Sequence, residues 1–168
     1  MKIEDFSSDY QARALYESDI DTVFLLCGSN ELFYRYHPPF VTKESILEDM
    51  HALPPNKAFD DKFYFGFFRG EKLVAIMDLI LGYPNEQTAF IGLFMVDAKY
   101  QGKGVGSHII KHCVDVIKQA GFDSIRLGID KGNPQSERFW TKNKFTKTGE
   151  VREQEHGTIL LMERAIER

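Results

Sequence analysis

Three apolar runs in the middle of the chain predict strands that follow one another directly. Residues 62–68 and 72–81 are rich in aromatic and aliphatic side chains, and only the turn Arg69-Gly70-Glu71 separates them. A second turn, Gly82-Tyr83-Pro84-Asn85, leads to a third run at 88–96. Strands joined by such short turns are antiparallel neighbours, so we expect this part of the chain to form a meander.

After residue 104 the spacing of apolar positions becomes helical. An amphipathic run at 105–120 predicts a helix that ends at Gly121, because glycine is favoured just past helix ends. Residues 124–130 show an apolar alternation that predicts a strand. A second helix is expected to begin at Gly132-Asn133-Pro134 and to run to about Asn143, since proline is tolerated in the first helical turn.

The N-terminal third has a weaker pattern. Asp19 is expected to cap a helix that runs through Cys27. Another helix is expected to start after Thr42 and to end before Pro54-Pro55. Residues 30–40, between them, are rich in aromatic side chains and contain paired prolines, so we expect an irregular segment there.

Two further strands are expected near the end of the chain, at 145–152 and 158–167. A meander combined with a strand–helix–strand crossover implies a mixed sheet covered by helices, an α/β fold. At 168 residues, with no visible linker or repeat, the chain is expected to form one domain, 1–168.

Composition indicates an ordinary globular protein. Hydrophobic residues make up 43% and charged residues 27% of the chain. No apolar stretch reaches the ~20 residues that span a bilayer, and the first residues lack the basic-then-apolar pattern of a signal peptide. Cys27 and Cys113 do not form a Cys-x-x-Cys pair. We therefore expect a cytoplasmic protein with reduced cysteines and no membrane partner.

Charge is distributed unevenly along the chain. The first 98 residues carry 8 basic and 16 acidic side chains, whereas residues 99–147 carry 10 basic and 4 acidic ones. The basic segment fits a polyanionic ligand and the acidic part fits a cationic second ligand, with an unevenly charged, solvated surface as the alternative. Nucleic acid is not an expected partner, because the net charge is −4 and no run combines aromatic and basic side chains.

The string Gln101-Gly102-Lys103-Gly104-Val105-Gly106 joins the strand at 88–96 to the helix at 105–120. Glycines let backbone N–H groups approach a ligand, and the first N–H groups of a helix favour an anion. The string therefore predicts a phosphate-bearing ligand, with a tight turn that binds nothing as the alternative. It is not a Walker A loop, and Ser107 stands where a dinucleotide fingerprint needs glycine.

The same string resembles the Q/R-x-x-G-x-G/A signature of the GNAT acetyltransferase superfamily. The segment Asn133-Pro134-Gln135-Ser136-Glu137-Arg138-Phe139-Trp140-Thr141-Lys142-Asn143-Lys144-Phe145 is similar to the family's later region. In that region an asparagine after a strand precedes a helix with an aromatic pair and a closing phenylalanine. The resemblance implies the GNAT acyl-CoA N-acyltransferase fold, a central mixed, mostly antiparallel sheet of six to seven strands flanked by helices.

The resemblance also implies a binding path for acetyl-CoA. The strands at 88–96 and 124–130 would separate at their ends, and pantetheine would lie between them. Backbone groups near Phe94, Met95 and Val96 would pair with its amides, and the backbone from Gly102 to Gly106 would hold the diphosphate. Side-chain contacts would come from residues along this path: Gln101, Lys103, Ser107, Asn133, Ser136, Phe139 and Trp140.

The implied reaction is direct transfer of acetyl from acetyl-CoA to the primary amine of a small molecule. No cysteine lies in the expected site, so a covalent acyl-enzyme is not expected. Candidates for the base that deprotonates the amine are Glu86, His37 and Asp78, each with a surface or structural role as the alternative. Residues expected to shape the acceptor pocket are Tyr34, Tyr36, His37 and Phe40, with an ordinary packed loop as the alternative. Homodimers are common among similar proteins.

Trp140 departs from the family pattern. Many members have at this position a tyrosine that protonates the leaving thiolate, whereas an indole N–H donates hydrogen bonds but has no usable acidity. A non-catalytic acyl-CoA-binding regulatory module is therefore the main alternative function, and a nucleotide-binding protein is a weaker one.

His108 and His112 lie four residues apart in the helix at 105–120, a spacing that can bind a metal ion. The apolar positions of this helix place both histidines on its outer face. No glutamate lies between them and the sequence shows no obvious third ligand, so we expect no metal site.

Overall fold

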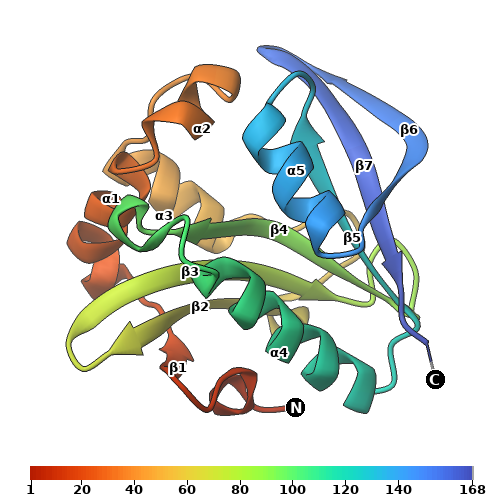
Figure 1. Cartoon of the computed structure of the whole chain (residues 1–168), viewed down its shortest axis with the longest axis horizontal. Coiled ribbons are helices and arrows are strands. Elements are labelled where there is room, and N and C mark those ends of the chain that lie inside the picture. Colours follow the sequence, from red (N-terminus) through yellow and green to blue (C-terminus); the bar gives the residue numbers. More distant parts are fainter. Residues whose placement is uncertain (168) are drawn as a thin grey trace.

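The structure, a computed structural model, describes residues 1–167, in which seven strands form one sheet (Figure 1). The strands are β1 (Gln11–Ala14), β2 (Lys62–Arg69), β3 (Lys72–Leu81), β4 (Thr88–Val96), β5 (Ser124–Asp130), β6 (Thr146–Gln154) and β7 (Gly157–Ala165). Their order across the sheet is β1-β2-β3-β4-β5-β7-β6. Within this part of the chain, β4 and β5 pair in parallel and the other neighbours are antiparallel, which confirms the predicted mixed, mostly antiparallel α/β sheet.

The α-helices are α1 (Ile20–Gly28), α2 (Glu31–Tyr36), α3 (Lys43–His51), α4 (Val105–Gln119) and α5 (Pro134–Lys142). Short 3-10 turns are η1 (Ile3–Phe6), η2 (Glu17–Asp19), η3 (Phe59–Asp61) and η4 (Ala98–Tyr100). None of the helices within residues 1–167 has the length and apolar character needed to cross a membrane.

Helices cover both faces of the sheet. On one face, α4 and α5 pack on the strands through a cluster that includes Ile117 and Met77. On the other, α1 and α3 pack through a cluster that includes Ile46 and Ile76. Ile76 and Met77 are consecutive in β3 and belong to different clusters, as the alternation of side chains along a strand requires. Figure 1 shows α4 crossing the sheet and α5 lying beside β5 and β7.

The two cysteines lie on opposite sides of this sheet. Cys27 belongs to the cluster of α1 and α3, and Cys113 to the cluster of α4 and α5. Both are buried, and neither forms a disulfide within residues 1–167.

The N-terminal third differs most from the sequence prediction. Residues Glu31–Tyr36 form helix α2, where the aromatic pattern predicts an irregular segment. The paired prolines at 38 and 39 lie just beyond this helix and therefore limit only its end. The sequence also does not predict strand β1, because its four residues are too few to show the apolar alternation of a strand.

Asp19 precedes α1 as predicted, but it does not cap that helix. Its carboxylate accepts hydrogen bonds from Arg13 at 3.0 and 3.1 Å and from the backbone N–H of Tyr16 at 2.9 Å. No side-chain bond from Asp19 to the first turn of α1 is formed. The guanidinium supplies a stronger, charged donor than a helix N–H, so the carboxylate serves the β1–α1 connection instead.

Candidate functional site

The parallel strands β4 and β5 pair over only part of their length. The register joins Thr88 through Ile91 to Ser124 through Leu127, and residues 92–96 and 128–130 do not pair with each other. β4 continues alongside β3, and β5 continues alongside β7. The sheet is therefore open between the C-terminal ends of β4 and β5, which diverge in Figure 1.

A bulge in β4 lies at the start of this opening. Asp78 pairs with Leu93, but its neighbour Leu79 pairs with Ile91, so Gly92 is an extra residue on β4. A Cβ on Gly92 would lie 3.1 Å from Oδ2 of Asp78, so glycine here leaves room for the carboxylate. The bulge bends the end of β4 and keeps Asp78 beside the opening.

A first pocket, the glycine-loop pocket, has a volume of about 340 Å³ and lies between the end of β4, the first turn of α4, and α5. Most of the residues expected to bind acetyl-CoA line it: Phe94, Met95, Val96, Gln101, Gly102, Gly104, Val105, Gly106, Ser107, Ser136, Phe139 and Trp140. Neither Lys103, which is exposed in the same loop, nor Asn133, which is buried and precedes α5, lines this pocket. The fold thus brings together residues that the sequence separates into two segments.

The backbone of the loop explains two of its glycines. Gly102 and Gly104 have φ angles of +75° and +81°, in the left-handed region that favours glycine. A Cβ at either position would meet no atom within 4 Å, so conformation and not crowding selects glycine there. Gly104 is the residue that precedes α4, and the turn therefore presents the unpaired N–H groups of that helix to the pocket.

Gly106 has a different role from the other two. It lies within the first turn of α4, and a Cβ there would be 2.8 Å from Cε1 of Phe139. The expectation that all three glycines simply clear a ligand-facing turn is therefore incomplete. Gly106 also lets α5 pack closely against α4, because the ring of Phe139 occupies the space of its missing side chain.

Side-chain amides hold the end of β4 against the loop. The carbonyl oxygen of Val96 accepts hydrogen bonds from Nε2 of Gln101 at 2.8 Å and from Nδ2 of Asn30 at 3.2 Å. Nε2 of Gln101 also donates to Oδ1 of Asn30 at 2.7 Å. The amide nitrogen of Gln101 is therefore used within the protein, where the resemblance implies a contact to the ligand. Asn30 is a site residue that the sequence analysis misses.

The two polar atoms of the Asn133 side chain differ in their hydrogen bonding. Its Oδ1 caps α5 by accepting hydrogen bonds from the N–H groups of Gln135 at 3.1 Å and Ser136 at 3.3 Å. The residue is 1% exposed, and its Nδ2 has no hydrogen-bond partner among residues 1–167. A buried amide donor left without an acceptor costs about 1–3 kcal/mol, so this group is suited to a ligand carbonyl.

A second pocket, the acidic pocket, has a volume of about 450 Å³ and lies on the other side of the opening, beside α2 and α3. Three carboxylates line it: Asp49 of α3, Asp78 of β3 and Asp130 at the end of β5. Four residues line both pockets: Phe33, Phe94, Ser136 and Trp140. The two pockets therefore meet at the opening between β4 and β5.

Trp140 is fixed at this meeting point by aromatic contacts. Its ring centroid lies 4.9 Å from that of Phe139, 5.1 Å from that of Phe145 and 6.0 Å from that of Phe94. The residue is 8% exposed. Edge-on contacts of this kind hold a ring in one orientation, so the indole is a rigid wall between the pockets.

Asp78 is the carboxylate of the acidic pocket that forms an ion pair with a lysine. Both of its oxygens lie 3.0 Å from Nζ of Lys62, and the two side chains are 14% and 4% exposed. Burial raises the pKa of Asp78, and the ammonium of Lys62 opposes that change. A carboxylate with both oxygens held by a lysine is poorly placed to accept another proton.

Asp49 is a free carboxylate in the same pocket. Its side chain is exposed, and it has no side-chain hydrogen bond or ion pair among residues 1–167. Desolvation by the surrounding atoms of the pocket wall, together with the negative charge of Asp78, raises the pKa of Asp49 to about 6. Sequence reasoning misses Asp49, and its one signal is a position beside the buried stripe of α3 formed by Ile46 and Met50.

His37 and Asp130 form a pair at the edge of the acidic pocket. Nδ1 of His37, just past the end of α2, lies 2.9 Å from Oδ1 of Asp130. The hydrogen bond to this carboxylate raises the pKa of His37. Asp130 is 7% exposed and is, after Asn30 and Asp49, the third residue of the site that the sequence pattern does not predict.

The other predicted substrate and base residues separate into two groups. Tyr34 lines the acidic pocket, and burial raises the pKa of its phenol. Tyr36 and Phe40 line neither pocket. Glu86 is exposed in the turn before β4, lines neither pocket, and does not join His37 and Asp78. Glu86 precedes the N-terminal end of β4, whereas the opening lies at the C-terminal end of that strand. The length of β4 therefore separates Glu86 from the opening.

Comparisons with known proteins agree with this geometry. Residues 30–145 match the model of the acetyltransferase (GNAT) family. No curated protein matches the sequence. The structure resembles a spermidine N-acetyltransferase from Vibrio cholerae, solved with CoA and spermine, with a TM-score of 0.69 and 17% identity over 95% of this chain and 97% of that chain.

Two other solved structures are similar to the same degree. For Ard1 from Thermoplasma volcanium the TM-score is 0.70, with 18% identity over 95% of this chain and 99% of that chain. For the ribosomal-protein-S18-alanine N-acetyltransferase from Escherichia coli it is 0.69, with 13% identity over 94% of each chain. At such identities these structures establish the fold alone.

The family model covers more than half of the chain and includes the open strand pair, the glycine loop, α4 and α5. The solved structures share the arrangement of the whole sheet. The chain belongs to the acetyltransferase (GNAT) family.

Proposed function

We propose that this protein transfers the acetyl group of acetyl-CoA to the primary amine of a small, cationic molecule. The observation that carries the proposal is the meeting of two pockets at the opening between β4 and β5. One pocket ends in unpaired helix N–H groups, which suit a diphosphate, and the other is lined by three carboxylates, which suit an ammonium group.

Coenzyme A fits the residues of the glycine-loop pocket. The loop at Gly102 and Gly104 and the first turn of α4 offer backbone N–H groups to the diphosphate. The buried Nδ2 of Asn133 offers a donor to a pantetheine carbonyl. When bound, acetyl-CoA supplies an acetyl thioester, a group that an amine attacks without prior attachment to the protein.

The acceptor is proposed from the acidic pocket. Asp78 is paired with Lys62 and Asp130 with His37, whereas Asp49 has no ion pair among residues 1–167, so Asp49 is the carboxylate of this pocket that is left to receive an ammonium group. The similar structure from Vibrio cholerae is named a spermidine N-acetyltransferase and was solved with spermine. A compact polyamine or another small cationic amine is therefore the acceptor that we propose.

Proton removal is the larger of two energetic problems in this transfer. An alkylammonium with a pKa near 10.4 costs ~4.6 kcal/mol to neutralise at pH 7, whereas release of a thiolate with a pKa near 8.5 costs ~2 kcal/mol. We propose Asp49 as the base, because its oxygens are free and its raised pKa lies near neutrality. The pair of His37 and Asp130 is the second candidate.

Trp140 supports a second candidate function, an acyl-CoA-binding module without catalysis. It lies where the two pockets meet, at the position where many family members carry a tyrosine acid. Its indole N–H can donate a hydrogen bond but cannot give up a proton. The small cost of thiolate release favours an enzyme that works without this acid, at a reduced rate.

A free-thiol assay with acetyl-CoA over a panel of amines tests the proposal. We expect thiol release that depends on a di- or polyamine and is weaker for neutral or acidic amines. Saturable binding of acetyl-CoA with no thiol release across the panel would favour the non-catalytic module. Release driven by acidic amines would contradict the role of the acidic pocket.

A further inference from the structure

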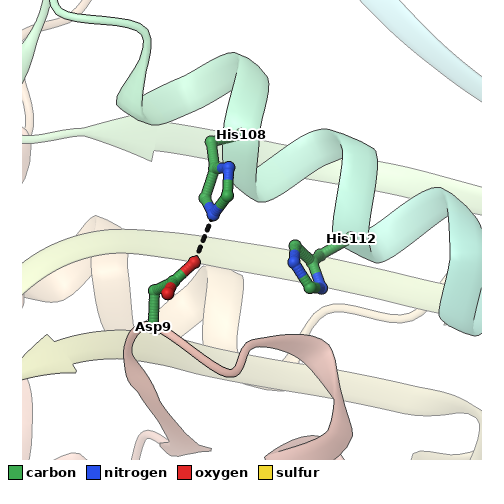
Figure 2. Close-up of side chains that lie close together, drawn as sticks. All are labelled: Asp9, His108 and His112. Carbon is green, nitrogen blue, oxygen red and sulfur yellow. Dashed lines mark hydrogen bonds and ion pairs between the residues drawn. The ribbon is translucent and has the colours of Figure 1, made fainter.

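Three metal-ligating side chains meet on the outer face of α4, away from both pockets (Figure 2). His108 and His112 project from successive turns of the helix, and Asp9 reaches them from the segment that joins η1 to β1. One ligand atom from each side chain lies within 4.8 Å of the other two. Asp9 thus supplies the third ligand that the sequence pattern of α4 lacks.

The donor atoms are already partly arranged. Oδ2 of Asp9 is hydrogen-bonded to Nε2 of His108. The ring centroids of His108 and His112 are 5.2 Å apart. Donor atoms around a four-coordinate zinc ion are roughly 3.4 Å apart, given bonds of about 2.0–2.1 Å, so the side chains need only small rotations to close on an ion.

The backbone that carries Asp9 is held in place. Phe6 is fully buried and packs on Phe65 with ring centroids 4.9 Å apart, and Tyr10 is 9% exposed. Between them, Oγ of Ser7 accepts hydrogen bonds from the N–H groups of Asp9 at 3.2 Å and Tyr10 at 3.0 Å. Asp9 is therefore presented to α4 by a segment anchored at both ends.

We infer that Asp9, His108 and His112 form a binding site for a divalent transition metal ion, with Zn²⁺ the best match. Two imidazoles and one carboxylate are a donor set that zinc accepts, and water would complete four-coordination at this exposed surface. The ion would clamp the segment of residues 7–10 onto the first half of α4, the helix whose N-terminus forms the glycine-loop pocket.

The competing explanation is an ordinary hydrogen-bonded pair of Asp9 and His108 that binds no metal ion. The role of His112 distinguishes this pair from a metal site. His112 takes no part in the bond between Asp9 and His108. A simple pair does not need His112, whereas a metal site does. The pair of His51 and Glu17, with Nε2 and Oε1 2.9 Å apart on the surface, provides a matched control because no second histidine within residues 1–167 joins it.

The test is a calorimetric titration of tag-free, chelator-treated protein with ZnCl₂ in a buffer without thiols or CoA. We expect one ion per chain with a micromolar dissociation constant. Because loss of even an outer-shell partner costs 10–100-fold in metal affinity, His112→Ala should weaken binding by about 100-fold or more. His51→Ala should bind zinc as the wild type does.

A second measurement keeps the result clear if a variant folds poorly. Co²⁺ titrated into the wild-type protein should give the visible absorbance of a four-coordinate site, and Asp9→Asn, which can still hydrogen-bond to His108, should abolish it. Thermal melts of every variant check folding. Equal zinc affinity in the wild type and His112→Ala, or no saturable binding to the wild type, would overturn the inference.

Discussion

His37 and Asp130 are 93 residues apart in sequence and 2.9 Å apart between Nδ1 and Oδ1. Their contact ties the end of α2 to the end of β5, so the aromatic N-terminal segment is fastened to the open strand pair. It also places an imidazole–carboxylate pair on the acidic pocket. The same contact therefore has consequences for stability and for proton transfer.

Asp130→Asn should reduce stability only at low pH. The carboxylate raises the pKa of His37 above its ordinary value of about 6.5, so the protonated imidazole stabilises the fold. This contribution is complete below about pH 6.5 and is lost as the pH rises through the raised pKa. Because about half of the His37 side chain is exposed, we expect a loss below ~1 kcal/mol at low pH.

Urea denaturation of the wild type and Asp130→Asn, at about pH 5.5 and about pH 9, checks this dependence. An equal loss of stability at both pH values would show that Asp130 acts through packing alone. His37→Ala should reproduce the low-pH loss.

Asp49→Asn should lower kcat/KM by about 100-fold or more, since a positioned base contributes 10²–10⁴-fold. The wild-type kcat/KM should rise with pH through about 6, the pKa of Asp49, and the variant should lose that limb of the profile. Steady-state thiol release between about pH 5 and 9 is the measurement. Glu48→Gln, at the exposed neighbouring position on α3, is the control and should leave the profile unchanged.

The same substitution should not weaken the fold. A carboxylate whose pKa is raised in the native state binds its proton more tightly there, so its ionisation above pH 4 costs stability. Asp49→Asn should therefore be as stable as the wild type at neutral pH, or more stable by less than ~1 kcal/mol because the group is partly exposed. Lost activity together with a lower melting temperature would indicate disruption of α3 and not loss of a base.

Asn133→Asp and Asn133→Ala should separate helix capping from ligand binding. Aspartate keeps the oxygen that caps α5 but replaces the unsatisfied Nδ2 with a second acceptor. We expect Asn133→Asp to bind CoA at least ~10-fold more weakly and also to lose stability, because the new carboxylate is buried at a 1% exposed position and the N-terminus of α5 offsets that cost only in part. Asn133→Ala should bind weakly and also lose ~1 kcal/mol from the missing cap.

Calorimetry with CoA and thermal melts on the same samples provide both readouts. If Asn133→Asp binds CoA as tightly as the wild type, the buried amide is a capping residue with no role at the ligand.

Gly106→Ala should disturb the packing between α4 and α5. The added methyl would lie 2.8 Å from Cε1 and 3.1 Å from Cζ of Phe139, whose ring is itself packed on Phe94 and Trp140. We expect a loss of ~1–3 kcal/mol, as for other overpacked cores, and weaker CoA binding because Phe139 lines the pocket. Gly157→Ala, where a Cβ meets nothing within 4 Å, should change stability by less than ~0.5 kcal/mol.

Chemical denaturation of the two glycine variants measures the difference. If Gly106→Ala and Gly157→Ala have the same stability, the ring of Phe139 has room to move and the close packing of α4 on α5 is not tight.

The sequence predicts the second half of the fold well because each element there has a local signal. Strands 72–81, 88–96 and 124–130 are observed at the predicted bounds, since their apolar runs end at glycine or polar turns. Helix α4 follows the amphipathic run and the loop glycines before it. The short elements β1 and α2 have no such pattern, and contacts with the sheet and with α1 decide their form.

The two pockets of the candidate site also differ in how far the sequence predicts them. The glycine loop and the segment from Asn133 to Phe145 are contiguous in sequence, so a motif can find them. The acidic pocket joins α2, α3, β3 and β5, and Asp49 and Asp130 have no local feature that marks them. Asp9 meets His108 across 99 residues. Such contacts follow from topology, and a single sequence without a known fold does not reveal them.

The central claim is that the loop at Gly102–Ser107 and the opening between β4 and β5 bind coenzyme A. Isothermal titration of the protein with CoA at two temperatures tests it most directly, because a binding enthalpy near zero at one temperature is not zero at both. We predict one saturable site per chain with a micromolar dissociation constant that weakens as salt screens the diphosphate. No saturable heat at either temperature, with CoA raised to about 1 mM, would contradict the account.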